Sequence, residues 1–439
     1  MSGLRPNGTR MGAILLYPAA LMTWPAVVIA VLLGIAWIAV TALYILASRQ
    51  VRSMADALRA DALPAAPPGI SPDLLPSLSI IVTARDEVAA IEATVRHALE
   101  QVYPGLEVIV VDDRSSDGTA ELLDRLAATV GAGRLQVIHV RALPAGWIGK
   151  CHACHEGARR ARGAFLLFMD GDVTLAAPDL LARTITWMEH GDIDHLALFP
   201  DLRPYGALQA CLLHSFEQAM LLMTRGWEME RDLPRGGAGV GAFNLIRRIA
   251  YDRVHGHALL RMEVADDYKL GMLLKESGAR QRIRGGLGIV RCPWHRGTLA
   301  VLRGLEKNLF SGSDYSVGLL AAQTAAAFAL HAGPLLVGLA AGTPAGWLPL
   351  ATQVGCIVAA AASAAQRIDK HPLVLAGLYP VSFALLTFAV WNSALRTLWR
   401  GGVRWRDTFY PLEQLRAGLV RRGAGRRLTA AGPGAIIPR

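Results

Sequence analysis

The chain has 439 residues, of which 53% are hydrophobic and 18% are charged, and its formal net charge is +10. This composition, with its positive mean hydropathy, excludes an ordinary soluble enzyme of this length and indicates that much of the chain meets lipid. The basic balance favours a phosphate-bearing ligand or an anionic membrane surface. No basic run is interleaved with aromatic residues, so we predict no nucleic-acid partner. Five cysteines, an odd number without disulfide-framework spacing, favour a reducing compartment.

The N-terminal part is nearly unbroken apolar sequence over residues 13–47, with arginines on both sides. It is about twice as long as the apolar region of a signal peptide and lacks a good cleavage site. We therefore predict a retained membrane anchor over residues 1–50. The composition then changes to a stretch rich in proline and alanine, which predicts a linker over residues 51–76.

Residues 78–310 alternate short apolar runs with helical stretches, which predicts an α/β domain with a mostly parallel sheet. The runs read LSIIVTA, LEVIVVD, LQVIHV, AFLLFMD and HLALFP. Polar clusters end the first, second and fourth runs, and the carboxyl ends of parallel strands meet in one crevice. The clusters contain Thr83, Arg85, Asp86, Glu87, Asp112, Asp113, Arg114, Ser115, Asp117, Asp170 and Asp172.

Asp170 and Asp172 form a D-x-D pair directly after the fourth run. Hard divalent cations prefer carboxylate oxygens, and Mg²⁺ commonly takes one or two from protein while phosphate oxygens and water complete its shell. The pair therefore fits a cation that holds a diphosphate. Taken alone, such a pair is more often an acidic turn, and the surrounding motifs favour the metal site.

Four strings occur in a fixed order: SIIVTARDE, VIVVDDRSSDGT, FMDGDV and VADDYKL. This ordered set resembles the family 2 glycosyltransferases with a GT-A fold, and we expect that domain over residues 77–312. The segments LPAGWIGKCHACHEG and GAFNLIRRIAYDRVHGH look most like the hopanoid-biosynthesis-associated membrane branch and related carotenoid-type transferases. The resemblance implies an inverting transferase that moves one sugar from a nucleoside-diphosphate sugar to a lipid acceptor, a hopanoid or another polyisoprenoid-derived lipid.

The resemblance also implies roles for individual residues. Asp267 matches the family's general base, and Asp266 stands where the family has glutamate. Asp170 and Asp172 would bind a divalent cation, Mg²⁺ or Mn²⁺. A solvated acidic turn is the alternative for Asp266 and Asp267, and a capped helix start is an alternative or additional role for the second-strand motif. The residues expected to bind the nucleotide sugar are Thr83, Arg85, Glu87, Asp112, Asp113, Lys150 and Asp170.

The stretch CHACH allows a function of another class. Cys151, Cys154 and His155 match the C-x-x-C-H signature of haem c attachment, and His152 adds a further metal-ligand type. A membrane-tethered haem or zinc module is therefore one alternative. Haem attachment belongs to the exported side of a membrane, whereas sugar nucleotides are cytosolic, so we favour packing residues on a helix.

Two other interpretations concern the transferase itself. Many processive family members carry Q-x-x-R-W near the end of the catalytic domain, and residues 285–312 contain no such motif. A polysaccharide synthase of the same family is therefore a weaker alternative than single transfer. An inactive scaffold is disfavoured because Asp170, Asp172 and Asp267 are intact.

Three apolar stretches, at about 317–341, 346–365 and 372–399, predict transmembrane helices within residues 313–400, followed by a basic tail at 401–439. We expect a multi-pass protein of the inner membrane with a cytoplasmic catalytic domain. If all three stretches cross, the tail lies outside, against the positive-inside rule. Either one stretch is interfacial or re-entrant, or the tail overrides the rule.

Overall fold

The computed structural model describes residues 24–59, 75–130, 133–368 and 370–431. Much of the predicted linker and the extreme termini lie outside these residues. The described residues separate into two compact units. One contains 24–39 and 325–356, and the other contains the rest of the described chain, including the catalytic domain expected from the sequence.

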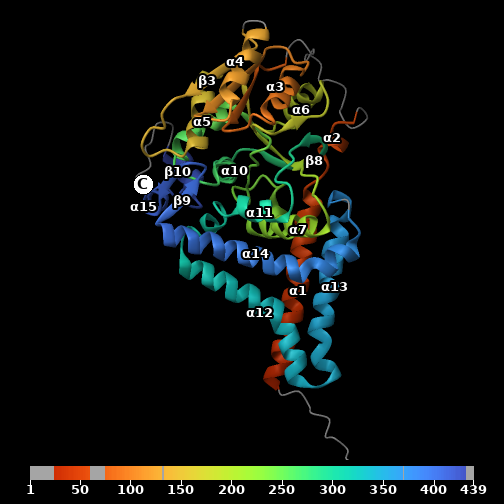
Figure 1. The fold of residues 1–439 in the computed structure, drawn as a ribbon. Coiled ribbons are helices and arrows are strands. Elements are labelled where there is room, and N and C mark those ends of the chain that lie inside the picture. Colours follow the sequence, from red (N-terminus) through yellow and green to blue (C-terminus); the bar gives the residue numbers. More distant parts are fainter. Residues whose placement is uncertain (1–23, 60–74, 131–132, 369, 432–439) are drawn as a thin grey trace, which may run out of the picture. The chain divides into compact units, whose positions relative to one another are not determined.

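The larger unit is built on one eight-stranded mixed sheet in the order β3-β2-β1-β4-β7-β6-β8-β5 (Figure 1). The β3-β2-β1-β4 half is entirely parallel, and antiparallel β7 joins it to the second half. The five apolar runs predicted as strands are β1, β2, β3, β4 and β6, each within one residue of the expected limits. The strands are β1 (Leu78–Ala84), β2 (Leu106–Asp113), β3 (Leu135–Val140), β4 (Phe165–Asp170), β5 (Thr174–Leu175), β6 (His195–Asp201), β7 (Asn244–Arg247) and β8 (Gln281–Arg291).

Helices cover both faces of this sheet because its central strands are apolar on both sides. Ile80 and Val82 of β1 pack into one core cluster with α3, α4 and α6, whereas Ile81 packs into another with α5, α10 and α16. Successive residues of a strand point to opposite faces, which explains this division. The helices are α2 (Met54–Ala57), α3 (Ile91–Leu99), α4 (Thr119–Thr129), α5 (Gly149–Arg160), α6 (Leu180–His190), α7 (Ala207–Met223), α8 (Arg248–Arg253), α9 (Gly256–Leu259), α10 (Asp266–Glu276) and α11 (Thr298–Leu305).

Four helices in the described residues are long and apolar enough to cross a membrane. They are α1 (Trp24–Gln50), α12 (Val317–Ala341), α13 (Leu348–Ile368, with a preceding 3-10 turn) and α14 (Pro372–Arg400). In the smaller unit, the Trp37 indole donates to the Leu330 carbonyl over 2.8 Å, and Gln353 donates to the His331 carbonyl. In the larger unit, α14 packs along α7 (Figure 1). The hydroxyls of Ser215 and Ser382 lie 2.5 Å apart at this contact.

The predicted basic tail contains regular structure. A two-stranded hairpin of β9 (Gly402–Trp405) and β10 (Thr408–Pro411) leads into α15 (Leu412–Ala417) and α16 (Ala424–Ala431). The Glu276 carboxylate of α10 accepts hydrogen bonds from the amides of Gly423 and Gly425. Residues 402–431 therefore belong to the catalytic unit, and the remaining predicted tail lies outside the described residues.

Candidate functional site

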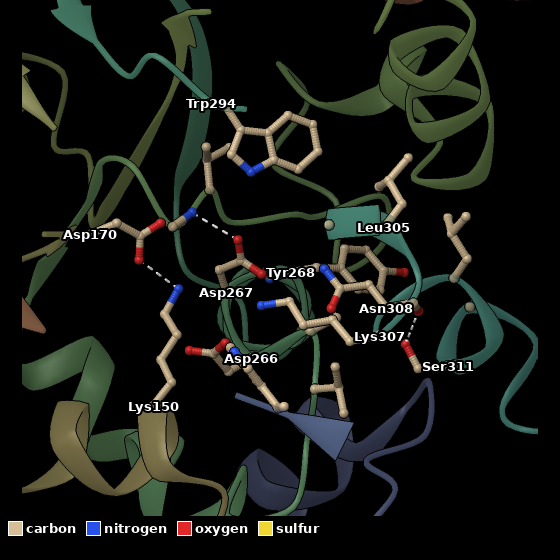
Figure 2. A pocket seen from close by; sticks show the side chains of 18 of the residues that line it. Lys150, Asp170, Asp266, Asp267, Tyr268, Trp294, Leu305, Lys307, Asn308 and Ser311 are labelled. Carbon is tan, nitrogen blue, oxygen red and sulfur yellow. Dashed lines mark hydrogen bonds and ion pairs between the residues drawn. The ribbon is translucent and has the colours of Figure 1, made fainter. Parts of the chain in front are cut away.

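The predicted site residues meet at a cavity of about 1730 Å³. It opens where β1 and β4 end, beside the first turns of α5 and α10 (Figure 2). Asp112 is the predicted residue that does not line it. The nine that do are Thr83, Arg85, Glu87, Asp113, Lys150, Asp170, Asp172, Asp266 and Asp267.

Three carboxylates gather at the carboxyl ends of β1 and β4. Burial, followed by the charge of Asp172, raises the pKa of Glu87 to about 7. Burial and the neighbouring Asp170 also raise the pKa of Asp172. Three carboxylates that destabilise one another's charge fit a divalent cation, because its charge would relieve that repulsion and its preferred ligands are carboxylate oxygens. The donor set is therefore appropriate for Mg²⁺ or Mn²⁺.

Lys150 in the first turn of α5 reaches this acidic cluster. Its Nζ lies 2.7 Å from Asp170 Oδ1. Burial opposes the charge of Lys150, but Asp170, Asp266 and Asp267 outweigh it and raise the lysine pKa well above its usual range. Lys150 lines the cavity and is paired with Asp170, so it is not a solvated surface lysine.

Gly241 lets three charged groups approach the same point. A Cβ atom at this position would lie 2.9 Å from Asp170 Oδ2, 3.0 Å from Lys150 Nζ and 3.2 Å from Asp267 Oδ2. The Gly241 amide also donates to Asp267 Oδ2 over 2.8 Å, as the dashed line in Figure 2 shows. Asp170, which is predicted to bind the cation, and Asp267, the predicted base, therefore face the same small space beside Gly241.

The adjacent Asp266 and Asp267 have different surroundings. Asp266 is buried, and its carboxylate lies 3.6 Å from His257 Nε2. Burial opposes the charge of Asp266, but Lys150 and His257 outweigh it and lower the pKa of Asp266. Burial and the charge of Asp266 raise the pKa of Asp267. Asp267 is thus the better placed of the two to accept a proton at the cavity.

The two aspartates at the end of β2 also diverge. Asp113 lines the cavity and pairs with Arg114 through contacts of 2.8 and 3.1 Å. Asp112 accepts from the Ser115 amide and lies 3.0 Å from His139 Nδ1, so both its oxygens are engaged within the turn and the β2–β3 edge. The structure brings Asp113, but not Asp112, to the cavity.

The CHACH side chains do not converge. Within the described residues, Cys154 is the only one of the four that belongs to a metal-type cluster, with His257 and Asp266. Cys151 points to the Glu263 carbonyl, while His155 stacks on the Trp147 ring at 5.0 Å. Helix α5 therefore sends its cysteines inward and packs His155 against an aromatic ring, which matches the packing interpretation.

Beyond the charged groups, the cavity has an apolar wall. This wall could not be recognised from the sequence, because α7 and α14 are apolar around most of their circumference and show no distinct binding face. It is formed by α7, α11, the start of α12, and α14. The wall residues are Leu202, Phe216, Met220, Met223, Leu305, Leu309, Leu319, Leu386 and Val390.

Sequence reasoning missed the C-terminal side of the cavity. Trp405, Arg406 and Tyr410 of the hairpin line it, together with Lys307. Lys307 Nζ lies 3.5 Å from the centre of the Trp405 ring. The short aromatic and charged alternation VRWRDTFYP is the only signal in the sequence that marks a folded hairpin there.

Residues 79–267 match the model of glycosyl transferase family 2. Over 243 residues, the chain is 27% identical to a 4,4'-diaponeurosporenoate glycosyltransferase of Staphylococcus aureus, covering 54% of this chain and 62% of the relative. The chain thus spans less than two thirds of that relative. A mannosyltransferase from Pyrobaculum calidifontis, solved with GDP-Man and Mn²⁺, is similar in structure with a TM-score of 0.50 and 20% identity. The match covers 85% of this chain and 99% of the mannosyltransferase.

These findings identify a glycosyltransferase family 2 domain and confirm the predicted GT-A-type α/β fold with flanking apolar helices. The family model ends at Asp267, the predicted base. The apolar wall's α11, α12 and α14, like the C-terminal hairpin, lie beyond the matched residues.

Proposed function

We propose that this protein is a membrane-bound, cation-dependent, inverting glycosyltransferase that moves one sugar from a nucleoside-diphosphate sugar to the hydroxyl of a lipid. The observation that carries the proposal is the continuity of the cavity, which has an acidic and cationic end at the sheet and an apolar wall at the long helices. Such a cavity suits a polar donor and an apolar acceptor that must meet at one point.

The donor belongs at the sheet end. Asp113 and Thr83 offer oxygen acceptors for the base and ribose, and Arg85 lines the same cavity with its Nη1 3.5 Å from Asp113 Oδ2. Asp170 and Asp172 would hold the divalent cation, which neutralises the charge that grows on the diphosphate leaving group. Lys150, held by Asp170, adds a positive charge to the same region.

The acceptor belongs along the apolar wall. The S. aureus relative is named for an acceptor of the carotenoid type, which supports an apolar polyisoprenoid-derived substrate here. A hopanoid hydroxyl is the acceptor that we favour within this class, in accordance with the sequence resemblance. Burial of an apolar acceptor in the cavity would contribute roughly 25 cal/mol for each Å² of apolar surface removed from water.

The chemistry requires one base. Asp267 lies where Lys150, Asp170 and the Gly241 amide converge, and its raised pKa favours proton uptake from an acceptor hydroxyl. The deprotonated hydroxyl oxygen attacks the sugar carbon as the bond to the diphosphate breaks. A single displacement of this kind inverts the configuration of the sugar.

The long apolar helices support a membrane location for the protein. We assign it to the inner membrane as a multi-pass protein, with the catalytic unit on the cytoplasmic side where nucleotide sugars occur. The four candidate spans support membrane association.

The experiment is sugar transfer by the purified full chain in lipid nanodiscs. Labelled UDP- and GDP-sugars are supplied with a hopanoid alcohol, a carotenoid carboxylic or hydroxy acceptor, or a soluble oligosaccharide. We expect one sugar on one lipid class, inverted configuration by NMR, and loss of turnover on chelation that Mn²⁺ or Mg²⁺ restores. The double variant Asp170→Asn/Asp172→Asn is inactive in this scheme.

Other outcomes point elsewhere. A ladder of products on a soluble acceptor would indicate a polysaccharide synthase. Full activity of the double variant in chelator would contradict the cation assignment. Arg427→Ala, on the exposed side of α16, serves as the control for a charge change outside the cavity.

A further inference from the structure

The hairpin β9–β10 closes one side of the cavity although it follows the last long helix. It begins directly after α14, where Gly401 adopts a φ of 70° that ends the helix. Four of its residues line the cavity: Arg404, Trp405, Arg406 and Tyr410. The hairpin therefore contributes to a site whose other charged residues include those of the strand ends, α5 and α10.

The base of the hairpin is fixed to the catalytic unit. The buried Tyr410 accepts a hydrogen bond from the Gly149 amide over 3.1 Å at the start of α5. Tyr410 and Val403 also pack in one hydrophobic cluster with Ile148. These contacts hold the two strands in place, so the tip has a defined position over the carboxyl ends of β1 and β2.

The tip places an arginine where glycine is normally favoured. Trp405 pairs with Thr408, so Arg406 and Asp407 form a two-residue turn. Arg406 is its first residue and has a φ of 57°. Such a φ costs a side-chain-bearing residue about 1 kcal/mol or more, and glycine would avoid that cost. An outlier of this kind points to a use for the side chain.

The tip contacts residues assigned to the donor. Arg406 Nη2 lies 2.8 Å from Glu87 Oε1, and Asp407 pairs with Arg85. The Nε of Arg85 is buried and has no hydrogen-bond partner among the described residues. Lys307, whose Nζ lies 3.5 Å from the centre of the Trp405 ring, is a further cation on this side of the cavity.

We propose that the hairpin completes the donor site and that Arg406, together with Lys307, binds the diphosphate of the nucleoside-diphosphate sugar. This inference rests on the proposed function. Arg406 and Lys307 line the same cavity as Glu87, Asp170 and Asp172, the predicted cation end. A guanidinium binds phosphate oxygens through two parallel hydrogen bonds, and a phosphate group would replace the single contact with Glu87.

The consequence is that donor recognition needs the chain on both sides of the long apolar helices. The strand ends would supply the carboxylates that hold a cation, and Arg406 of the hairpin and Lys307, which precedes α12, would supply the positive charges that meet the phosphates directly. Charge on the departing diphosphate is then stabilised from two directions. In the proposed function the nucleoside is assigned to Asp113 and Thr83, whereas Arg406 contacts Glu87, so nucleoside and diphosphate recognition can be tested separately.

The test measures nucleotide binding by calorimetry with Mn²⁺ for the full chain in nanodiscs. The probes are UDP, GDP and the monophosphates UMP and GMP. The variants are Arg406→Gly, which relieves the turn, Arg406→Lys, which keeps one charge without the fork, and Arg427→Ala as a charge control. Arg406→Asn replaces the glycine variant if that protein does not fold, because asparagine tolerates a positive φ.

We expect Arg406→Gly to weaken diphosphate binding by about 10- to 100-fold, the range for lost charge-assisted hydrogen bonds. Monophosphate binding and the melting temperature should stay near wild type, and Arg406→Lys should fall between the two. Equal diphosphate affinity of Arg406→Gly and wild type would overturn the proposal, as would an equal loss for mono- and diphosphates. If the wild-type protein binds neither diphosphate, the proposed function itself fails.

Discussion

Asp267 and Asp266 are adjacent, and their separate roles can be tested by one pair of substitutions. Asp267→Asn keeps the size of the side chain but cannot take a proton from the acceptor. Both Asp267 oxygens accept backbone hydrogen bonds, from Gly241 over 2.8 Å and from Tyr268 over 2.7 Å. The asparagine amide can replace only one of these acceptors, so a stability cost of about 1–3 kcal/mol accompanies the change.

We expect turnover of Asp267→Asn to fall by about 10² to 10⁴, the range for a lost general base, while donor affinity persists. Asp266→Asn should lower turnover less, and it should also change the pH dependence of the rate. Asp266 raises the pKa of Asp267, so its neutralisation lowers that pKa. Since a base works only when deprotonated, the acidic limb of the rate profile moves to lower pH in Asp266→Asn.

The assay combines initial rates over a pH series with donor calorimetry and thermal unfolding for each variant. Asp124→Asn, an exposed carboxylate beside His139, is the matched control. Normal turnover of Asp267→Asn, whether or not Asp266→Asn is inactive, would mean that another carboxylate is the base. Loss of donor binding in both variants would instead place the pair in the nucleotide site.

Three further substitutions test other parts of the cavity. Gly241→Ala places a methyl group 2.9 Å from Asp170 Oδ2 and should lower kcat at least about tenfold. Gly318→Ala, which has open space around its Cβ, is the control and should keep the wild-type kcat. Equal kcat values for the two variants would refute the close approach at Gly241. Cys151→Ala with Cys154→Ser should retain most activity, and metal analysis should find neither haem nor stoichiometric zinc; a Soret band or bound zinc lost in this variant would revive the metal module. Burial and Lys150 lower the pKa of Lys307 to about 7, so Lys307 loses its charge and diphosphate affinity should fall as pH rises above 7. Lys307→Arg keeps its charge and should flatten this fall. If the pH dependence of diphosphate affinity is the same in Lys307→Arg and wild type, Lys307 is not part of the donor site.

The catalytic half of the fold was predictable because its signals are local. β1 alternates between two core clusters, and the polar residues at the strand ends follow each apolar run without a gap. The crevice rule then brings Glu87, Asp113 and Asp170 together without any long-range information. Asp112 was harder to place because its neighbour Asp113 has the same chemistry, and only tertiary contacts with His139 distinguish them.

The rest of the cavity depends on contacts between residues far apart in the sequence. Arg406 and Glu87 are more than 300 positions apart, and no periodic pattern relates them. The β9 and β10 strands are four residues each, too short for alternation to stand out in a sequence rich in arginine. Cys154 and His257 are also far apart in the sequence. CHACH alone suggested four ligands close together, whereas the fold groups Cys154 with His257 and Asp266.

The packing of residues 402–431 favours one of the membrane topologies that the sequence left open. Lys269 donates to the Val420 carbonyl, and Glu276 accepts from the Gly423 amide, so the C-terminal elements are on the same side of the membrane as the catalytic unit. We therefore predict that the chain between residues 313 and 400 crosses the membrane an even number of times, although it contains three apolar helices long enough to span.

The helix that fails to cross should be α14. Cys211 of α7 donates to the Leu375 carbonyl, and Ser393 accepts from the Phe310 amide, so α14 is attached to the catalytic unit along much of its length. Its opposite side remains apolar and exposed at Leu373, Val381, Phe388, Leu395 and Trp399, as expected for a helix lying in the membrane interface.

We therefore predict that α12 and α13 cross as a pair and that the arginine-rich C-terminal part stays in the cytoplasm, in agreement with the positive-inside rule. Reporter fusions at the C-terminus and in the 342–343 connection measure this directly. A cytoplasmic C-terminus with an external connection is the expected pattern, with a fusion after Arg52 as the cytoplasmic reference. An external C-terminus would require either a third crossing or an unfolded hairpin, and would remove Arg406 from the donor site at the same time.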